Sequence, residues 1–352
     1  MKTTATLDTL FDQVADKPVA LMLFARQLLA RGQDQRAREL CVDAIAMAPE
    51  NAEVRALAAE IFNHGLPSWH VHILRDQARN LAYDAALRRA VKPGCQVLEV
   101  GTGSGLFAMM AARAGAAQVV TCERQPAVAA AALDSFVRNG YSDQIQVLSR
   151  DFADLEVGVD LNAPADVMVM EPFAPNVVGR GILPIMEQAA RRLLRPGAQV
   201  IPARATVRIA LAEDRDVQLE RMGTVEGFDL SAFNRLLLPA YGIGAGSDRL
   251  TLRSEAHDLF CFDFQSGGPF PEDRTSVSLI SSGGCVNGVA QWMRLTLDDV
   301  GWYENRPAVG TVSAWSVRFF PLVRPIELEA GESLTIFGSH DRATVRIWAQ
   351  VT

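Results

Sequence analysis

The sequence is short of the features that mark several large classes of protein. Its 352 residues include five cysteines and five histidines, and no cysteine pair has the spacing of a zinc or disulfide motif. We therefore predict no metal site and a reducing, cytoplasmic compartment. No apolar run approaches the length that spans a bilayer, and the first residues lack the pattern of a signal peptide. We accordingly expect no membrane association.

Positive charge is scarce as well. Lys and Arg together number 34 against 41 Asp and Glu, so that the formal net charge is −7, and no block of basic residues occurs. Binding to nucleic acid without sequence preference needs a basic surface, and we expect no nucleic-acid partner. Hydrophobic residues make up 49% of the chain. At this length they suffice for two domains and a small appendage.

The most informative stretch is residues 97–105, which read Val-Leu-Glu-Val-Gly-Thr-Gly-Ser-Gly. The mostly apolar residues 97–100 predict a buried strand, and the three glycines predict a tight turn. The run of helix-forming residues at 106–114 predicts a helix. Gly101, Gly103 and Gly105 leave room for a ligand beside the backbone. The start of the helix offers free N–H groups and the positive end of a dipole. The pattern predicts a nucleoside-cofactor site on an α/β sheet.

Acidic residues around this turn favour S-adenosylmethionine as the cofactor. The spacing is Gly-x-Gly-x-Gly rather than the Gly-x-Gly-x-x-Gly of dinucleotide-binding proteins. Glu99, just before the turn, suits the cationic groups of S-adenosylmethionine and would repel a pyrophosphate. Glu123, after a predicted strand at 118–122, is placed to accept hydrogen bonds from both ribose hydroxyls. An NAD site and a glycine-rich turn without a ligand are the alternatives.

A second acidic position follows the predicted strand at 145–148. Asp151 can hold the adenine amino group while Phe152 covers a face of the ring, because ligands of such sheets bind at the carboxyl ends of the strands. The alternative is that Asp151 only caps the next turn.

The chain divides into three predicted parts. Residues 1–64 are helical, and within 18–51 small and turn residues fall at the positions of a tetratricopeptide repeat; this segment, with the helix to residue 62, either binds a protein partner or packs on the main domain. Residues 65–203 alternate helices and strands, with helices expected over 69–91 and over 183–194, the second ending at Arg195-Pro196-Gly197. From 204 to 352, short alternating runs separated by Pro, Gly and Asp predict an antiparallel barrel or sandwich.

The segment Ile73-Leu74-Arg75-Asp76-Gln77-Ala78-Arg79, with the glycine turn and the segments 227–231 and 259–264, resembles the protein arginine methyltransferases, in particular the subgroup with N-terminal tetratricopeptide repeats. The resemblance covers residues 69–352. It implies a Rossmann-like class I methyltransferase domain followed by a β-barrel for substrate binding and dimerisation, and hence a homodimer. It also implies that Arg79 pairs with the cofactor carboxylate and that Asp76 holds the active-site wall. From the residues alone, these two side chains are equally a surface helix pair.

The predicted cofactor-binding residues are therefore Arg79, Glu99, Gly101, Thr102, Gly103, Gly105, Glu123, Asp151 and Phe152.

The acceptor side departs from the family pattern at two places. The family grips a guanidinium with two glutamates on one loop; here Glu171 matches the first, whereas Arg180 stands in place of the second. A threonine–histidine–tryptophan loop in the family's barrel reads Ser313-Ala314-Trp315 here, so that Asp76 is expected to lose its histidine partner. We predict Trp315 as a substrate contact. Arg180 beside a substrate guanidinium would cost about 1–4 kcal/mol at roughly 4 Å.

Three hypotheses follow from these departures. In the first, an active methyltransferase has a changed acceptor, Arg180 holds an anionic group such as a small-molecule carboxylate, and Glu171 is the general base. In the second, the acceptor is still protein arginine, Arg180 turns outward, and another acid such as Glu187 replaces the missing glutamate. In the third, the protein is a weak or inactive cofactor-binding scaffold that uses its helical repeat. The cofactor half alone also fits a ribosomal-protein methyltransferase, which lacks the barrel.

We thus predict an S-adenosylmethionine-dependent methyltransferase with Glu171, Arg180 and Asp76 in its catalytic site, whose acceptor is a protein arginine or a small molecule.

Overall fold

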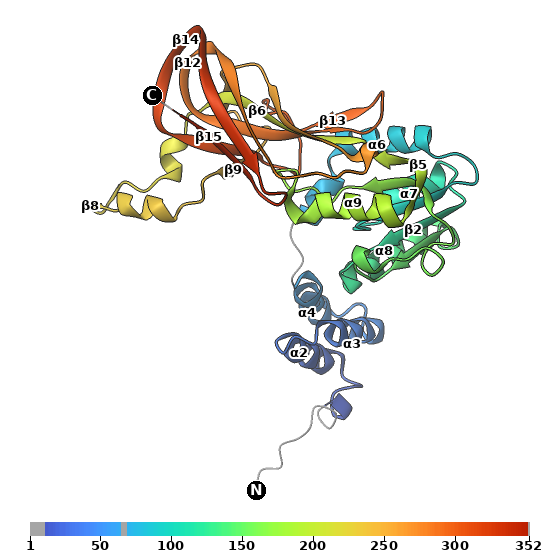
Figure 1. The fold of residues 1–352 in the computed structure, drawn as a ribbon. Coiled ribbons are helices and arrows are strands. Elements are labelled where there is room, and N and C mark those ends of the chain that lie inside the picture. The colour runs from blue at the N-terminus through green and yellow to red at the C-terminus, as the bar shows by residue number, and fades with distance from the viewer. Residues whose placement is uncertain (1–10, 65–68, 351–352) are drawn as a thin grey trace.

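The computed structural model describes residues 11–64 and 69–350. Figure 1 shows three parts: a group of helices at the N-terminal end, a unit built on a parallel sheet, and an antiparallel sheet that ends near the C-terminus. The predicted boundary between the first two parts falls at residues 65–68, which lie outside the described residues.

The N-terminal part consists of α2 (Pro18–Leu29), α3 (Asp34–Met47) and α4 (Ala52–Asn63). Proline stands in the first turn of α2, where no backbone N–H is needed, and the Asn51 side chain accepts hydrogen bonds from the N–H groups of Glu53 and Val54 to start α4. The three helices bury a hydrophobic core of their own, separate from the core of the main body. The prediction of helices is confirmed for the described part of this segment, and residues 1–10 lie outside the described residues.

Two helices lead into the parallel sheet, α5 (Trp69–Leu74) and α6 (Gln77–Ala90). We predicted one helical stretch over 69–91. The chain breaks at Asp76 because its side chain accepts a hydrogen bond from the Arg79 N–H at 3.0 Å and caps the second helix. The break directs α5 and α6 separately toward the cavity described below.

The parallel sheet has the order β3-β2-β1-β4-β5. Its strands are β1 (Gln96–Val100), β2 (Gln118–Cys122), β3 (Ile145–Leu148), β4 (Ala165–Met170) and β5 (Leu194–Ile201). The connecting helices are α7 (Leu106–Arg113), α8 (Pro126–Asn139) and α9 (Ile182–Arg192). The chain runs outward from β1 in one direction to β3 and then returns to β4 on the other side. This reversal opens a crevice at the carboxyl ends of β1 and β4, where ligands of such sheets bind.

One boundary in this unit differs from the prediction. The helix expected over 183–194 ends at Arg192, and Arg195-Pro196-Gly197 lies within β5 instead of terminating a helix. Proline and glycine are tolerated there because β5 is an edge strand, paired with β4 alone.

The antiparallel sheet contains β6 (Arg204–Asp214), β9 (Tyr241–Ile243), β10 (Leu250–Leu252), β11 (His257–Asp263), β12 (Asp273–Thr296), β13 (Trp302–Glu304), β14 (Val317–His340) and β15 (Val345–Ala349). Several short predicted runs merge into β12 and β14, which pair along most of their length with register shifts. Short 3₁₀ helices lie at Phe152–Asp154, Gly179–Gly181, Val217–Glu220, Ser231–Leu236 and Phe264–Ser266. One hydrophobic core continues from the parallel sheet into this sheet, so the two units form one body.

The segment 227–231, expected in the barrel, lies elsewhere. It belongs to residues 217–240, here called the arm, which carries the two-stranded hairpin β7 (Thr224–Val225) and β8 (Phe228–Asp229) and projects from the sheet (Figure 1). Phe228 is 71% exposed. Phe228, which the family resemblance places in the barrel, therefore lies on a protruding surface.

Among the described residues, no helix is both long and apolar enough to cross a membrane.

Candidate active site

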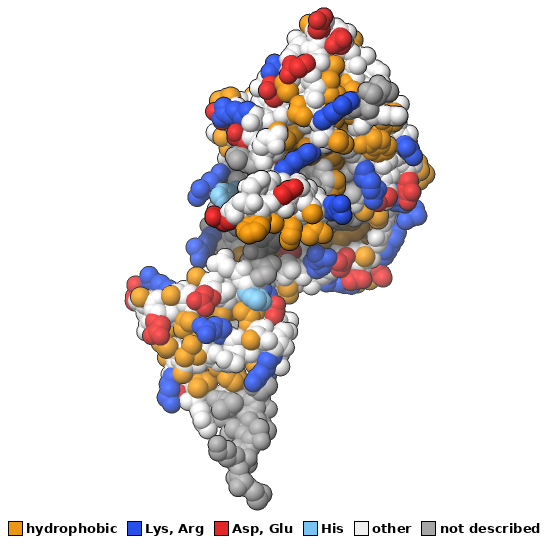
Figure 2. Space-filling model, turned by 90° about the vertical axis from the view of Figure 1, so that its left-hand side faces the viewer, with side chains coloured by type: hydrophobic (Ala, Val, Ile, Leu, Met, Phe, Trp, Pro, Cys, Tyr) orange, Lys and Arg blue, Asp and Glu red, His pale blue; other side chains and the backbone are white. Residues whose placement is uncertain are grey.

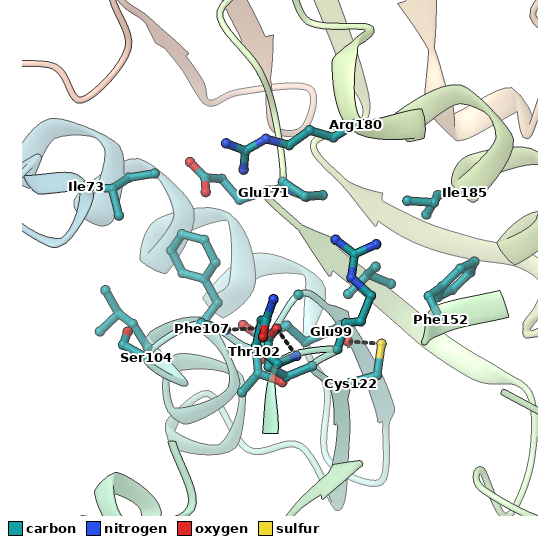
Figure 3. A pocket seen from close by; sticks show the side chains of 18 of the residues that line it. Ile73, Glu99, Thr102, Ser104, Phe107, Cys122, Phe152, Glu171, Arg180 and Ile185 are labelled. Atoms are coloured by element: carbon teal, nitrogen blue, oxygen red, sulfur yellow. Dashed lines mark hydrogen bonds between the residues drawn. The ribbon is translucent and has the colours of Figure 1, made fainter. Parts of the chain in front are cut away.

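A cavity of about 650 Å³ opens at the carboxyl ends of β1 and β4 (Figure 3). Its walls come from α5, α6, the glycine turn and the loops after β2, β3 and β4. Most of the predicted site residues line it: Arg79, Glu99, Gly101, Thr102, Gly103, Glu123, Asp151, Phe152, Glu171 and Arg180. Asp76, Gly105 and Trp315 do not line the cavity. The volume is within the range of small-molecule sites.

The three glycines of the turn serve two purposes. All have positive φ, and a Cβ added at Gly101 or Gly103 would meet nothing within 4 Å, which leaves the cavity floor open to a ligand. At Gly105 a Cβ would lie 2.2 Å from the Phe136 ring. The expectation that all three glycines make room for a ligand is therefore wrong for Gly105, which permits close packing of α7 and α8.

Glu123 is held at the edge of the glycine turn. Its Oε2 accepts a hydrogen bond from the Gly103 N–H at 3.2 Å and its Oε1 accepts one from the Gln125 N–H at 2.9 Å. The carboxylate is thereby fixed just after the end of β2, and Glu123 lines the cavity. This position agrees with contact to a ribose, which stays a prediction.

Glu99 is 2% exposed and lies below the turn. The Thr121 hydroxyl donates to its Oε2 at 2.7 Å, and Thr121 is in turn 2.7 Å from the Thr102 hydroxyl. Burial raises the pKa of Glu99 to about 8, against the opposing effect of Thr121. At neutral pH the carboxyl is mostly protonated, and a cationic ligand group would draw it into the charged form.

Asp151 has a capping role that the structure shows directly. Its Oδ1 accepts a hydrogen bond from the Ala153 N–H at 3.0 Å and starts a 3₁₀ turn. The side chain also lines the cavity beside the buried Phe152. Capping and contact with adenine are compatible, since a carboxylate has two oxygens.

Arg79 is 4% exposed and Asp76 is 1% exposed, which excludes a surface pair. The Arg79 Nε donates to Glu171 Oε1 at 2.8 Å, and its Nη1 donates to the Ile73 carbonyl at 3.1 Å. Its guanidinium lies over the Phe107 ring, 4.7 Å from the ring centre. The resemblance implies that Arg79 pairs with the cofactor carboxylate. In this structure its guanidinium connects Ile73 in the cavity wall to Glu171 on the acceptor side.

Glu171 follows β4 directly and is nearly buried. Burial raises its pKa to about 7, although Arg79 and Arg180 both act to lower it. A carboxylate of this pKa changes protonation near neutrality, as a general base must.

Arg180 faces the same space. It is an exposed residue with a φ of 61° in the loop after β4, and Figure 3 shows its guanidinium directed toward Glu171. The hypothesis that Arg180 turns outward is therefore wrong. So is the replacement of the missing glutamate by Glu187, whose carboxylate accepts from the Phe270 N–H at 2.8 Å and pairs with Arg342 at 2.7 Å, outside the cavity.

Trp315 is 5% exposed and holds the acceptor loop, defined here as residues 171–181. Its Nε1 donates to the Phe173 carbonyl at 3.0 Å, while Gln291 Nε2 donates to the Pro175 carbonyl at 2.9 Å. The predicted direct contact of Trp315 with the substrate is not what the structure shows; the indole anchors the loop from behind.

Asp76 keeps a partner despite the absent histidine. The Tyr303 hydroxyl, on β13, donates to Asp76 Oδ2 at 2.5 Å. The sequence contained no signal for this contact, because β13 is three residues long and lies more than 200 positions away. Tyr83, whose ring stacks on Phe107 at 4.4 Å, was also missed, although its place one helical turn after Arg79 was a usable signal.

Comparisons with known proteins agree with this architecture. A family model described as ribosomal protein L11 methyltransferase (PrmA) matches residues 84–203, the cofactor half. The chain is 32% identical over 306 residues to an arginine N(omega)-methyltransferase of Streptomyces achromogenes subsp. streptozoticus, covering 86% of this chain and 84% of that one. It is 31% identical over 251 residues to protein arginine N-methyltransferase 7 of Drosophila grimshawi, covering 65% of this chain but only 36% of that protein.

Solved structures share the fold. The Trypanosoma brucei PRMT1 enzyme–prozyme complex with AdoHcy superposes with a TM-score of 0.70 at 19% identity, over 82% of this chain and all of that one. Arabidopsis thaliana protein arginine methyltransferase 10 gives 0.64 at 17% identity, over 79% of this chain and 89% of that one.

The parallel-sheet unit with its glycine turn and the antiparallel unit after it define an S-adenosylmethionine-dependent methyltransferase. Within that class, the chain belongs to the protein arginine N-methyltransferase family.

Proposed function

We propose that this protein methylates a guanidine nitrogen of a small acceptor that also carries a carboxylate, free arginine being the simplest such molecule. The observation that carries the proposal is the pair of opposite charges on one cavity wall, Glu171 and Arg180 (Figure 3). The similar Streptomyces protein is named for arginine.

The residues of the cavity fit S-adenosylmethionine. Gly101 and Gly103 leave open space above the turn, Glu99 is a buried carboxyl that a cation would ionise, and Glu123 offers a fixed carboxylate at the end of β2. We assign these residues to the cofactor, together with Thr102, Asp151 and Phe152. Figure 3 places Glu99 and Thr102 across the cavity from Glu171 and Arg180, which separates a cofactor end from an acceptor end.

When bound, the cofactor supplies an electrophilic methyl group on a sulfonium sulfur. The protein's own part is to position the nucleophile and to remove its proton. Glu171 pairs with the guanidinium and accepts the proton that the reacting nitrogen loses. Its pKa of about 7 makes it a competent base at neutral pH.

Arg180 distinguishes acceptors by charge. Beside a lone guanidinium it is repulsive, whereas beside an acceptor with both a guanidinium and a carboxylate the same charge is attractive and forms a bidentate pair. A free amino acid carries that carboxylate, and an arginine inside a polypeptide does not. The Glu171–Arg180 pair therefore favours the free amino acid.

The test is methyl transfer from labelled S-adenosylmethionine to free arginine and, separately, to an arginine-containing peptide. We expect the wild type to methylate free arginine, Arg180→Glu to lose that activity by about tenfold or more, and the same variant to gain activity on the peptide. Arg324→Glu, which makes the same charge change on β14, is the control and should match the wild type. Transfer by the wild type to the peptide but not to free arginine would overturn the proposal.

We also propose a homodimer formed through the arm. Its apolar residues are exposed, among them Phe228 (71%), Leu236 (77%) and Leu238 (80%), and Figure 2 shows hydrophobic side chains gathered on the face from which the arm projects. Exposed Leu133 and Val137 on α8 offer an apolar surface for the arm of a second copy. Mutual docking of arm and helix gives a closed, two-fold contact.

The N-terminal helices are proposed to form a tetratricopeptide-like hairpin with one further helix. The small residues Ala25, Ala37 and Ala44 are fully buried between them, as close helix packing requires. We keep residues 1–64, 65–203 and 204–352 as the proposed parts, since the first has its own core. A protein partner for residues 18–62 and a cytoplasmic location stay predictions.

A further inference from the structure

The parallel-sheet unit and the antiparallel unit meet at a buried carboxylate beside the cavity. Asp76 is 1% exposed, and the Tyr303 hydroxyl reaches it from β13 at 2.5 Å. Tyr303 is itself 4% exposed, and its oxygen lies 2.9 Å from the Ser313 hydroxyl, which also accepts a hydrogen bond from the Trp315 N–H at 3.1 Å. These hydrogen bonds connect the loop around residues 313–315 to the start of α6.

The two oxygens of Asp76 have different tasks. Oδ1 accepts from the Arg79 N–H and begins α6, while Oδ2 accepts from Tyr303. A buried carboxylate needs such donors, because an unsatisfied oxygen carries a large desolvation cost. The phenol thus orients the group that starts the helix carrying Arg79.

The hydrogen bonds of the Arg79 side chain continue from Asp76 to two sides of the cavity. Its Nε contacts Glu171 at 2.8 Å, and its Nη1 contacts the carbonyl of Ile73, a residue that lines the cavity from α5. Displacement of the helix start would therefore move a cavity wall and the acceptor-side acid together.

We propose that Tyr303 is a positioning residue for methyl transfer: its hydroxyl, acting through Asp76, holds Arg79 and the wall formed by α5 and α6 in the arrangement that binds the cofactor and orients Glu171. The proposal rests on the proposed function of the cavity. Tyr303, on β13, takes over the contact expected from a histidine at the position of Ala314, which lies in the loop before β14.

The test compares two buried tyrosines that donate to aspartates. Tyr303→Phe removes the hydroxyl next to the cavity. Tyr241→Phe, the control, removes a hydroxyl that donates to Asp214 at 2.6 Å at the end of β6, and neither residue lines the cavity. Both variants retain the ring, and thermal unfolding of both shows how much stability each hydroxyl contributes.

The first measurement is calorimetric titration with S-adenosylhomocysteine, which needs no acceptor. We expect Tyr303→Phe to weaken binding about fivefold to tenfold, the effect of losing one ordinary hydrogen bond, and Tyr241→Phe to leave it unchanged. Equal affinities for wild type and Tyr303→Phe would overturn the positioning role alone. No binding by the wild type would overturn the proposed function, and this proposal with it.

The second measurement is the pH dependence of kcat/KM. Glu171 faces Arg79 from α6, Arg180 from the acceptor loop and Asp76 from the segment before α6. Since Arg79 lowers the pKa of Glu171, its displacement in Tyr303→Phe should move the acid limb of the profile from about 7 to higher pH. A loss of activity that leaves this midpoint in place would assign Tyr303 a structural role only.

Discussion

Two buried glutamates at opposite ends of one cavity have pKa values raised by the same cause. Glu99 lies at the proposed cofactor end and Glu171 at the proposed acceptor end, and burial raises the pKa of both toward neutrality. A cationic ligand beside either carboxyl would stabilise its ionised form and so bind favourably. The cavity is thus set to bind positive groups at both ends, while Arg180 adds an anion-binding position beside Glu171.

The protonation of Glu99 has a consequence for stability in the absence of ligand. Its pKa is about 8 in the folded protein against 4.5 in the unfolded chain. Between these values the folded state holds a proton that the unfolded state has lost, so stability falls as pH rises through this window, by at most about 5 kcal/mol.

Glu99→Gln keeps an acceptor for the Thr121 hydroxyl and removes the titration. Between pH 6 and pH 8 we expect the free energy of unfolding to fall less in this variant than in the wild type. The two decreases, measured by urea denaturation at both pH values, should differ by roughly 2 kcal/mol. Glu187→Gln is the matched control. Burial acts to raise the pKa of Glu187, but the Phe270 N–H and Arg342 outweigh it and hold the pKa below its usual value. This carboxylate is therefore charged over the whole interval from pH 6 to pH 8. A wild-type stability that rises with pH in step with the variant would contradict the assignment.

At the scale of elements, the acceptor loop depends on the antiparallel unit for its position. Trp315 donates a hydrogen bond to the Phe173 carbonyl, and Gln291 donates one to the Pro175 carbonyl. Side chains of the antiparallel unit therefore hold a loop that belongs to the parallel-sheet unit. The loop also stabilises itself, because the Asn176 side chain accepts from the Gly179 N–H at 3.1 Å. Arg180 therefore follows a loop segment that is held at Phe173 and Pro175 and closed by the contact between Asn176 and Gly179.

Trp315→Phe should loosen this loop. It removes the donor to the Phe173 carbonyl and retains most of the packing, so we expect the KM for the methyl acceptor to rise about fivefold and the affinity for S-adenosylhomocysteine to stay unchanged. Trp292→Phe is the control: it removes an indole donor to Glu304 at 2.6 Å inside the antiparallel unit. That variant should lose stability without a change in KM, and an acceptor KM unaffected by Trp315→Phe would show that the indole does not position the loop.

At the scale of the whole molecule, the arm is the feature that a single copy does not account for. Residues 217–240 expose large apolar side chains at the end of a projection, anchored at its base where Arg249 and Tyr241 both contact the buried Asp214. An exposed apolar projection of this kind supports the proposed contact with a second copy. A rigid base keeps the apolar face available for docking.

We expect the wild type to sediment as a dimer in analytical ultracentrifugation and the double variant Leu236→Glu, Leu238→Glu to sediment as a monomer, because the added charges would have to be desolvated in the contact. Val323→Glu, at a position 90% exposed on β14, serves as the control and should remain dimeric. A monomeric wild type, or a dimeric arm variant, would show that the arm is not the dimer contact.

The sequence by itself determined the cofactor half. The strand at 97–100, the glycine turn, Glu123 and Asp151 are close in the chain to the strands that carry them, and the carboxyl ends of parallel strands meet at one edge. Local pattern therefore sufficed to predict β2 and β3 at their observed bounds, and to bring Arg79 into the same site by resemblance.

The tertiary structure alone decided the acceptor half. Four features depend on residues brought together from distant parts of the chain. They are the direction of Arg180, the position of Trp315 behind the acceptor loop, the packing of Gly105 against Phe136 and the contact of Tyr303 with Asp76. Side-chain direction and long-range contact have no signature in local periodicity, because they are set by how the parallel and antiparallel units pack on one shared core.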